Sequence, residues 1–242
     1  MENVTLSVNT KGYTHKEIIM RAWRMTMIVA FAPFFFITVS AVSTWIATDY
    51  NLLSDNMSKL SGPGAQHPWV FQLGVVGYAL LIQCLGPLLY WQAGQNSHGA
   101  LLWGLVIIYS LIGIMAAVFR DGYNTLVIGE ITENTVHYFA ARISFSAVWL
   151  LTFVTPWVLR HQEGWLKWKR LSVAIGIITT ILVIPFVAEI WPTYQGLIQR
   201  LFFATTMLWI LVTANKLNTE ILYNPAHHSG KARPRKTASK PT

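Results

Sequence analysis

The residues of this chain that are best suited to chemistry lie inside or beside long apolar runs. They comprise one serine, one aspartate, one histidine, two arginines and one glutamate, namely Ser58, Asp121, His137, Arg142, Glu189 and Arg200. A serine hydroxyl becomes a nucleophile when an imidazole accepts its proton and a carboxylate orients that imidazole. Arginine side chains bind phosphate and carboxylate groups through paired N–H donors. These residue types therefore indicate either hydrolysis or transfer on a lipid, or the binding of an anionic group.

Charged side chains are concentrated in one short segment. Residues 119–145 read FRDGYNTLVIGEITENTVHYFAARISF and include Arg120, Asp121, Glu130, Glu133 and Arg142. This density is unusual because only 12% of the chain is charged, against roughly a quarter in an average soluble protein. We therefore expect the segment to form one wall of a polar pocket.

The elements that must position these residues are membrane-spanning helices. Apolar residues make up 53% of the chain, and a helix needs about 20 mostly apolar residues to cross the hydrocarbon core. Six windows meet this requirement, at residues 25–47, 70–91, 99–119, 137–159, 171–190 and 195–215. No window alternates between apolar and polar residues as a strand does. The sequence predicts an all-α integral membrane bundle of six transmembrane helices.

The spans divide the chain into an N-terminal tail at 1–24, a transmembrane domain at 25–215 and a basic tail at 216–242. The first apolar run is longer than the core of a signal peptide and follows a polar tail, so we expect it to remain as an anchor. The C-terminal tail is rich in Lys, Arg and Pro and poor in apolar residues, which predicts disorder beside anionic lipid.

Basic residues predict the orientation of the bundle. Four of the 18 Lys and Arg residues lie in the N-terminal tail, four in the connection at 160–170 and six from Lys216 onward. Cytoplasmic loops carry an excess of Lys and Arg, so both tails are expected to be cytoplasmic. With no organelle-targeting signal in the sequence, the expected location is a bacterial or archaeal inner (plasma) membrane.

Three short motifs resemble a known membrane family. The segment LSDNMSKLSGPGAQHPWVFQLGVVGYALL, with Ser58 and Leu60, is similar to the element before the second span of the six-helix family called domain of unknown function 998. An acidic residue after the third span and a histidine opening the fourth match as Asp121 and His137. A Gly, Arg and Trp in the last span match as Gly196, Arg200 and Trp209. The resemblance implies the six-helix architecture and no particular reaction.

The two arginines are expected to lie within the outer leaflet. Arg142 and Arg200 each fall a few residues inside a predicted span, which places them about 7–9 Å below the outer surface at 1.5 Å per residue. A charge at that depth normally faces the bundle interior or a wet cavity and has a partner. Glu189, just after Pro185, is the expected partner of Arg200. The alternative is that these charges are structural ion pairs that fix helix register.

Ser58, Asp121 and His137 are expected to share one pocket, with His137 at its centre. Asp121 ends one span and His137 begins the next, and consecutive antiparallel helices usually pack side by side. The function expected first is to bind, sense or move a lipid or small anion, or to act as an accessory subunit of a membrane complex, with Arg142, Arg200 and Glu189 binding the ligand. The alternative is a lipid hydrolase or transferase that uses Ser58, His137 and Asp121. Whether the protein is an enzyme stays open.

Metal ions, haem and nucleic acid are not expected as cofactors or partners. The chain has no His-x-x-x-His or Cys-x-x-Cys pair, the spacings that place metal ligands on one face. Its basic tail has no aromatic residue on which a nucleic-acid base could stack. We therefore expect no metal, no haem and no nucleic acid, and we expect membrane lipids and a protein within the membrane as partners.

Overall fold

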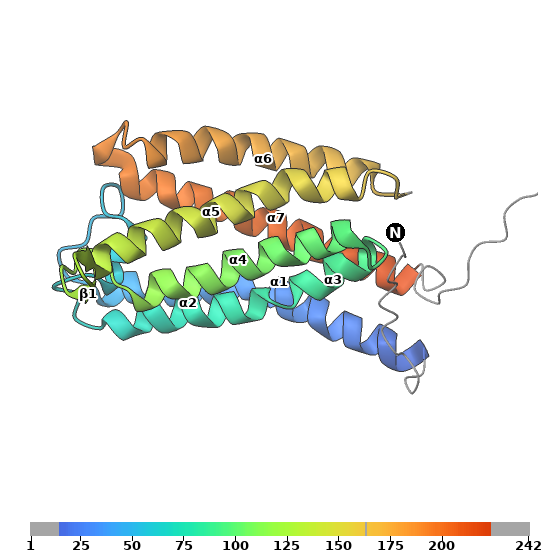
Figure 1. Ribbon diagram of the computed structural model, residues 1–242, viewed down its shortest axis with the longest axis horizontal. Coiled ribbons are helices and arrows are strands. Elements are labelled where there is room, and N and C mark those ends of the chain that lie inside the picture. Colours follow the sequence, from blue (N-terminus) through green and yellow to red (C-terminus); the bar gives the residue numbers. More distant parts are fainter. Residues whose placement is uncertain (1–14, 163, 224–242) are drawn as a thin grey trace, which may run out of the picture.

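A computed structural model describes residues 15–162 and 164–223, and its long helices lie side by side along one axis (Figure 1). The α-helices are α1 (His15–Ile46), α2 (Pro68–Ile82), α3 (Leu85–Gln92), α4 (Ser97–Val118), α5 (Glu133–Val158), α6 (Leu166–Val187) and α7 (Gln195–Tyr223). Two short 3-10 helices, η1 (Met57–Ser61) and η2 (Pro192–Tyr194), and two strands, β1 (Leu126–Ile128) and β2 (Ile131–Thr132), complete the described elements.

The predicted six-helix transmembrane bundle is confirmed. Within the described residues, six helical segments are long and apolar enough to cross a membrane, and α2 and α3 together form one of them, at Pro68–Gln92. The helices extend beyond the predicted spans at both ends, because α1 already begins at His15 and α7 continues to Tyr223. Arg and Lys favour helix although they are polar, so a helix can continue past the apolar window that marks its span. The rest of the predicted C-terminal tail lies outside the described residues.

The second span is interrupted near the middle of the bundle. Helix α2 ends at Ile82 and α3 begins at Leu85, two residues before Pro87. A proline has no N–H to bond the carbonyl four residues earlier and collides with it, which here is the carbonyl of Gln83. The break is stabilised by the Gln83 side chain, whose amide nitrogen donates a hydrogen bond to the Ser110 hydroxyl on α4.

Glycines let α1 and α2 pack closely. A Cβ at Gly74 would overlap the Val39 side chain, and one at Gly77 would lie 2.6 Å from the Phe35 ring. Small residues at such positions allow helix backbones in membranes to approach. Gly104, which shares the same sequence pattern, has nothing within 4 Å of its would-be Cβ, so it plays no such part inside the described bundle.

A small β-hairpin joins α4 to α5. Strands β1 and β2 pair antiparallel, with Leu126 opposite Thr132 and Ile128 opposite Ile131. A hairpin this short lacks the longer alternating pattern by which strands are recognised in a sequence, so the sequence did not predict it. Helix α5 then starts at a cap in which the Thr132 hydroxyl accepts from the Thr135 N–H.

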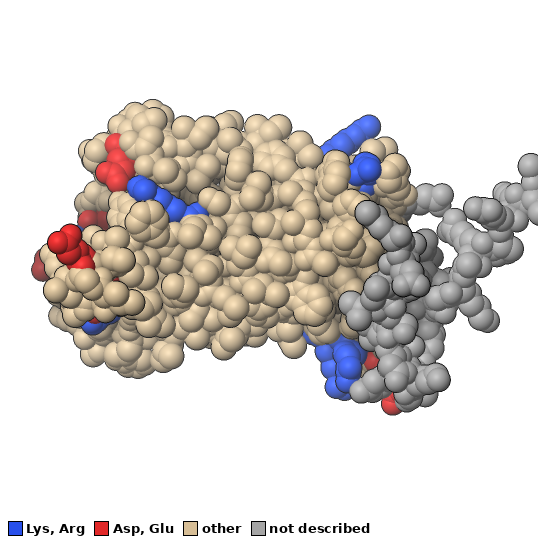
Figure 2. Space-filling model, in the orientation of Figure 1, with Lys and Arg blue, Asp and Glu red and all other residues tan. Residues whose placement is uncertain are grey.

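Charge separates the two ends of the bundle (Figure 2). Acidic side chains gather at the end that holds the hairpin and η1, while basic side chains gather at the end where α1 begins and α7 ends. The basic residues described at the latter end include Arg21, Arg24, Lys167 and Arg170. This distribution fits the expected orientation, which remains a prediction.

We predict that Gln66 and His161 face opposite sides of the membrane. Both side chains are exposed, in loops at opposite ends of the bundle. In a Cys84→Ser background, Gln66→Cys in intact cells should react with an impermeant maleimide, and His161→Cys should react only after the membrane is opened, because positive loops stay inside. Reaction of His161→Cys in intact cells would contradict the orientation.

Candidate functional site

A cavity of about 80 Å³ lies between η1 and helices α1, α2, α4, α5 and α7, large enough for several water molecules. Its walls are mostly apolar and include Phe36, Phe71, Val75, Phe145 and Phe203. Its polar side chains form two groups, with Ser58, His137 and Gln199 at the loop end and Tyr78, Tyr109 and Ser110 deeper in the bundle.

The imidazole of His137 is held by the end of α4. Its Nδ1 atom lies 2.6 Å from the Ala116 carbonyl oxygen and 2.9 Å from the Phe119 carbonyl oxygen. Carbonyls at the C-terminal end of a helix have no partner within the helix, and a carbonyl can only accept. Nδ1 must therefore carry a hydrogen. In the neutral ring Nε2 is then an acceptor, and it makes no hydrogen bond within the described residues.

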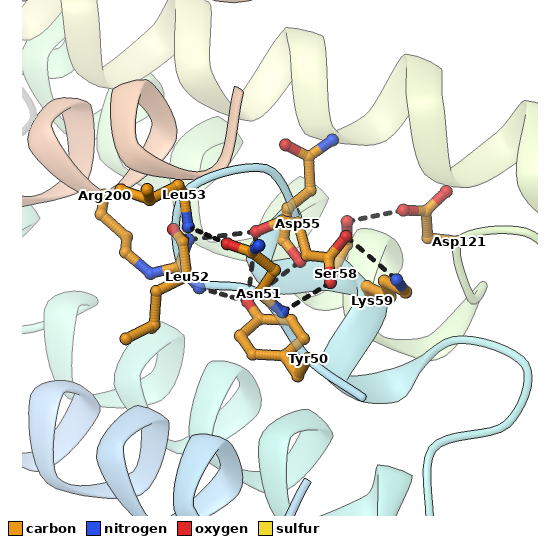
Figure 3. Close-up of polar contacts among 10 residues, drawn as sticks. Tyr50, Asn51, Leu52, Leu53, Asp55, Ser58, Lys59, Asp121 and Arg200 are labelled. Atoms are coloured by element: carbon orange, nitrogen blue, oxygen red, sulfur yellow. Dashed lines mark hydrogen bonds and ion pairs between the residues drawn. The ribbon is translucent and has the colours of Figure 1, made fainter. Parts of the chain in front are cut away.

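Ser58 and Asp121 are joined directly. The Ser58 hydroxyl donates a hydrogen bond to Oδ2 of Asp121 at 2.7 Å (Figure 3). This bond joins η1 to the connection that follows α4. Ser58 and His137 line the same cavity, and Asp121, which is not among the lining residues, reaches it through Ser58. That the three residues form one functional pocket stays a prediction. The expectation that the Asp121 carboxylate orients the imidazole is wrong, because carbonyls at the end of α4 orient it instead.

Arg200 fastens the first loop to α7. Its Nη1 atom donates to the carbonyl oxygens of Leu52 at 2.9 Å, Asp55 at 3.0 Å and Gly196 at 2.8 Å. Its Nη2 atom donates to the Tyr50 hydroxyl (Figure 3). Hydrogen bonds from a charged donor are stronger than those between neutral groups. The guanidinium therefore holds residues 50–56, and with them η1, against the start of α7.

Two neighbours of Arg200 complete this contact. A Cβ at Gly196 would collide with the carbonyl oxygen of Asp55, so only glycine lets the loop come this close. One turn further, the Gln199 side-chain oxygen accepts from the Met57 N–H at 2.6 Å, which leaves the amide nitrogen of Gln199 as a donor on the cavity wall.

Charge also orders the loop before η1. Burial raises the pKa of Asp55, but the Asn51 N–H, the bond from Lys59 and the nearby Arg200 charge outweigh it and hold the pKa below its usual value. The Lys59 Nζ atom lies 3.0 Å from Oδ1 of Asp55. Burial raises the pKa of Tyr50 despite Arg200, so its hydroxyl keeps the hydrogen that it shares with the Asp55 and Asn56 carbonyls.

Arg142 and Glu189 lie apart from the cavity. The Tyr138 hydroxyl donates to Oε1 of Glu189 at 2.8 Å, and the Arg142 guanidinium lies 4.8 Å from the centre of the Tyr138 ring. Arg142 is exposed. Five residues separate it from His137, which turns it about 140° around the helix, away from the cavity. The predicted pair of Glu189 and Arg200 is wrong, and so is the expectation that all six residues meet in one chamber.

Several polar residues of the cavity were not predicted from the sequence. Tyr78, Tyr109 and Gln199 are among those that line it, and each falls within an apolar run and resembles an ordinary packing residue. The feature that could have indicated these residues is a polar atom on a buried helix face, because such an atom normally needs a hydrogen-bond partner.

Among the residues that the structure describes, no group of three His, Cys, Asp or Glu side chains is arranged to hold a metal ion.

Comparison with known proteins gives one match. A family model described as Protein of unknown function (DUF998) matches residues 29–216. No curated protein and no solved structure matches the chain. The matched range contains every residue of the cavity and of the Arg200 contact.

We predict that Gly196→Ala destabilises the protein. The new methyl group would displace the Asp55 carbonyl from Arg200, and such overpacking costs on the order of 2 kcal/mol. The melting temperature in detergent should fall by several degrees. Gly104→Ala is the matched control, since it adds a methyl group in open space and should leave stability unchanged or raise it by up to about 1 kcal/mol. Equal melting temperatures for Gly196→Ala and the parent would contradict the close contact.

Proposed function

The chain belongs to the family described as Protein of unknown function (DUF998), and from its polar-ended cavity we propose that it binds an amphiphilic, lipid-like molecule with a neutral polar head. The match confirms the family resemblance seen in the sequence. The protein is a multi-pass membrane protein, and we place it in an inner (plasma) membrane with both tails cytoplasmic.

The observation that carries the proposal is the pairing of an unused acceptor with an unused donor at the loop end. Nε2 of His137 can accept a hydrogen bond, and the amide nitrogen of Gln199 can donate one. A hydroxyl or amide group can both donate and accept a hydrogen bond, so it would satisfy both residues. The apolar walls beyond them suit a hydrocarbon chain, as in most small-molecule sites.

The charges around the cavity favour a neutral head over an anionic one. The Arg200 guanidinium donates its hydrogen bonds to loop carbonyls, and Arg142 lies on the exposed face of α5. The nearest described charge that contacts the polar end is the Asp121 carboxylate, through Ser58. A phosphate or carboxylate head would face this negative charge in a medium of low dielectric constant, which is unfavourable. Sensing, moving or presenting the lipid to a partner subunit would each begin with this binding step.

We predict that filling the cavity abolishes binding. Ala141 lies one turn after His137 and lines the cavity, so Ala141→Leu would occupy the path of a hydrocarbon chain. The measurement is photolabelling in lipid nanodiscs with a diazirine analogue of dodecanoylglycerol, followed by peptide mapping. Labelling of cavity peptides should fall at least about tenfold, the equivalent of 1.4 kcal/mol.

The control is Ala174→Leu, which makes the same change on the exposed face of α6 and should label as the parent does. Absence of labelling on α2, α4 and α5 in the parent would refute the proposed binding. Equal labelling of the Ala141→Leu variant and the parent would refute its location in the cavity.

A second candidate, hydrolysis or transfer on a lipid ester, is favoured by one observation. Ser58 donates to Asp121 at 2.7 Å, and the acceptor nitrogen of His137 belongs to the same cavity. In this candidate the Ser58 oxygen attacks the ester carbonyl and its proton passes to Asp121 or His137. The bond from the acyl carbon to the ester oxygen then breaks, the alcohol leaves with that proton, and the acyl group stays on Ser58. Water would then release the acid and restore the serine hydroxyl.

The two candidates differ in their response to Ser58→Ala. Proteoliposomes that contain dodecanoylglycerol should release dodecanoic acid only if Ser58 acts as a nucleophile, and the variant should then lose at least about a thousandfold of the rate. Under binding alone, parent and variant release no acid, and the photolabelling of cavity peptides persists in both. Thin-layer chromatography of the extracted lipids separates these results.

A further inference from the structure

The deep end of the cavity carries a second polar subsite. We propose that Tyr78 and Tyr109 hydrogen-bond a neutral acceptor oxygen on the chain of the bound amphiphile, an inference that rests on the function proposed above. The ligand class is then an amphiphile with two neutral polar groups, a head at His137 and Gln199 and a ketone, ester or hydroxyl oxygen further along.

The two tyrosines meet deep inside the bundle. Their hydroxyl oxygens lie 2.8 Å apart, one from α2 and one from α4, and each residue is 5% exposed. Tyr78 is ten residues from the start of α2, so it lies about 15 Å from the loop end at 1.5 Å per residue. That is near the middle of a hydrocarbon core of roughly 30 Å, where bulk water is absent.

The hydroxyl hydrogens at the deep end of the cavity outnumber the acceptors that bind them. The bond between the two tyrosines uses one of their two hydrogens. The Ser110 hydroxyl donates to the Val106 carbonyl at 2.7 Å, and the Ser144 hydroxyl donates to the Tyr109 carbonyl at 2.7 Å. Among the described residues, neither tyrosine hydroxyl makes a hydrogen bond besides the one that joins them, so one of their hydrogens is unused. An unused donor is costly in a low-dielectric interior, and both tyrosines line the cavity.

The surroundings decide which acceptor fits. The Tyr78 ring packs 5.1 Å from the Phe36 ring, centre to centre, and Phe71 and Phe145 line the same space. The amide of Gln83 is already committed to Ser110. A carboxylate or phosphate would be stranded here without a cation, at a large desolvation cost. A neutral carbonyl, ether or hydroxyl oxygen would accept the unused hydrogen at little cost.

The spacing of the two subsites sets the position of the second oxygen. On α4 the lining runs from Ala117 to Tyr109, and on α5 from His137 to Phe145. Each run advances eight residues, which is roughly 12 Å along a helix. The second oxygen should therefore lie about 12 Å from the head group at 1.5 Å per residue, partway along an extended chain.

The test compares plain dodecanoylglycerol with its isomers that carry one ketone at successive chain positions. Each competes with the diazirine probe for the cavity peptides of the protein in nanodiscs. We expect one mid-chain isomer to compete about tenfold more strongly than the plain compound, the usual effect of one added hydrogen bond. Isomers with the ketone nearer either end should gain nothing.

The decisive variant is the double substitution Tyr78→Phe with Tyr109→Phe. Removing both hydroxyls together keeps the ring packing and leaves no buried hydroxyl unpaired, so the fold should tolerate it. In this variant the mid-chain ketone should compete no better than plain dodecanoylglycerol. If plain dodecanoylglycerol competes in the parent but no ketone isomer competes better, the deep subsite is refuted and the proposed function stands. If no compound competes in the parent, both are refuted.

Discussion

The hydrogen bonds of the Arg200 guanidinium are the interaction on which the hairpin end of the bundle depends. Its donors bind the carbonyls of Leu52, Asp55 and Gly196, so a loop between the first two spans is fixed to the start of the last. That loop leads into η1, which closes the cavity and brings Ser58 to Asp121. A charge within a membrane bundle needs a partner, and here the partner is loop backbone. One half-buried arginine thus holds the loop that covers the cavity.

The rest of the site follows from the rule that polar groups inside a membrane find partners within the protein. The end of α4 satisfies its carbonyls with the imidazole of His137, and the Met57 N–H is satisfied by Gln199. These bonds use one hydrogen-bonding atom of each polar side chain and leave its other hydrogen-bonding atom for the cavity. The unused atoms are an acceptor on His137, a donor on Gln199 and one hydrogen of the tyrosine pair. Together they describe the hydrogen bonds that a ligand would have to supply.

Hydropathy predicted the six spans, and loop order predicted that Ser58, Asp121 and His137 would come together. Both inferences rest on local patterns and on the packing of consecutive helices. Contacts between distant segments were beyond the sequence: Arg200 bonds to residues some 150 positions away, whereas the nearer Glu189 bonds to Tyr138. The rotation of Arg142 away from His137 could have been read from helical periodicity. Tyr78 and Tyr109 could not be told from packing aromatics until both hydroxyls were seen to meet.

The most direct test of this account is nitrogen-15 NMR of His137 in histidine-labelled protein, assigned with the His137→Gln variant and recorded in nanodiscs at neutral pH. The account predicts a hydrogen on Nδ1, because two carbonyls at the end of α4 require a donor there, and it predicts an Nε2 that accepts a hydrogen bond from the ligand. It also predicts that the Nε2 resonance moves when dodecanoylglycerol is added, while the Nδ1 resonance stays in place. A hydrogen on Nε2, or an Nε2 resonance that ignores saturating dodecanoylglycerol, would contradict the claim that His137 presents an acceptor to a bound amphiphile.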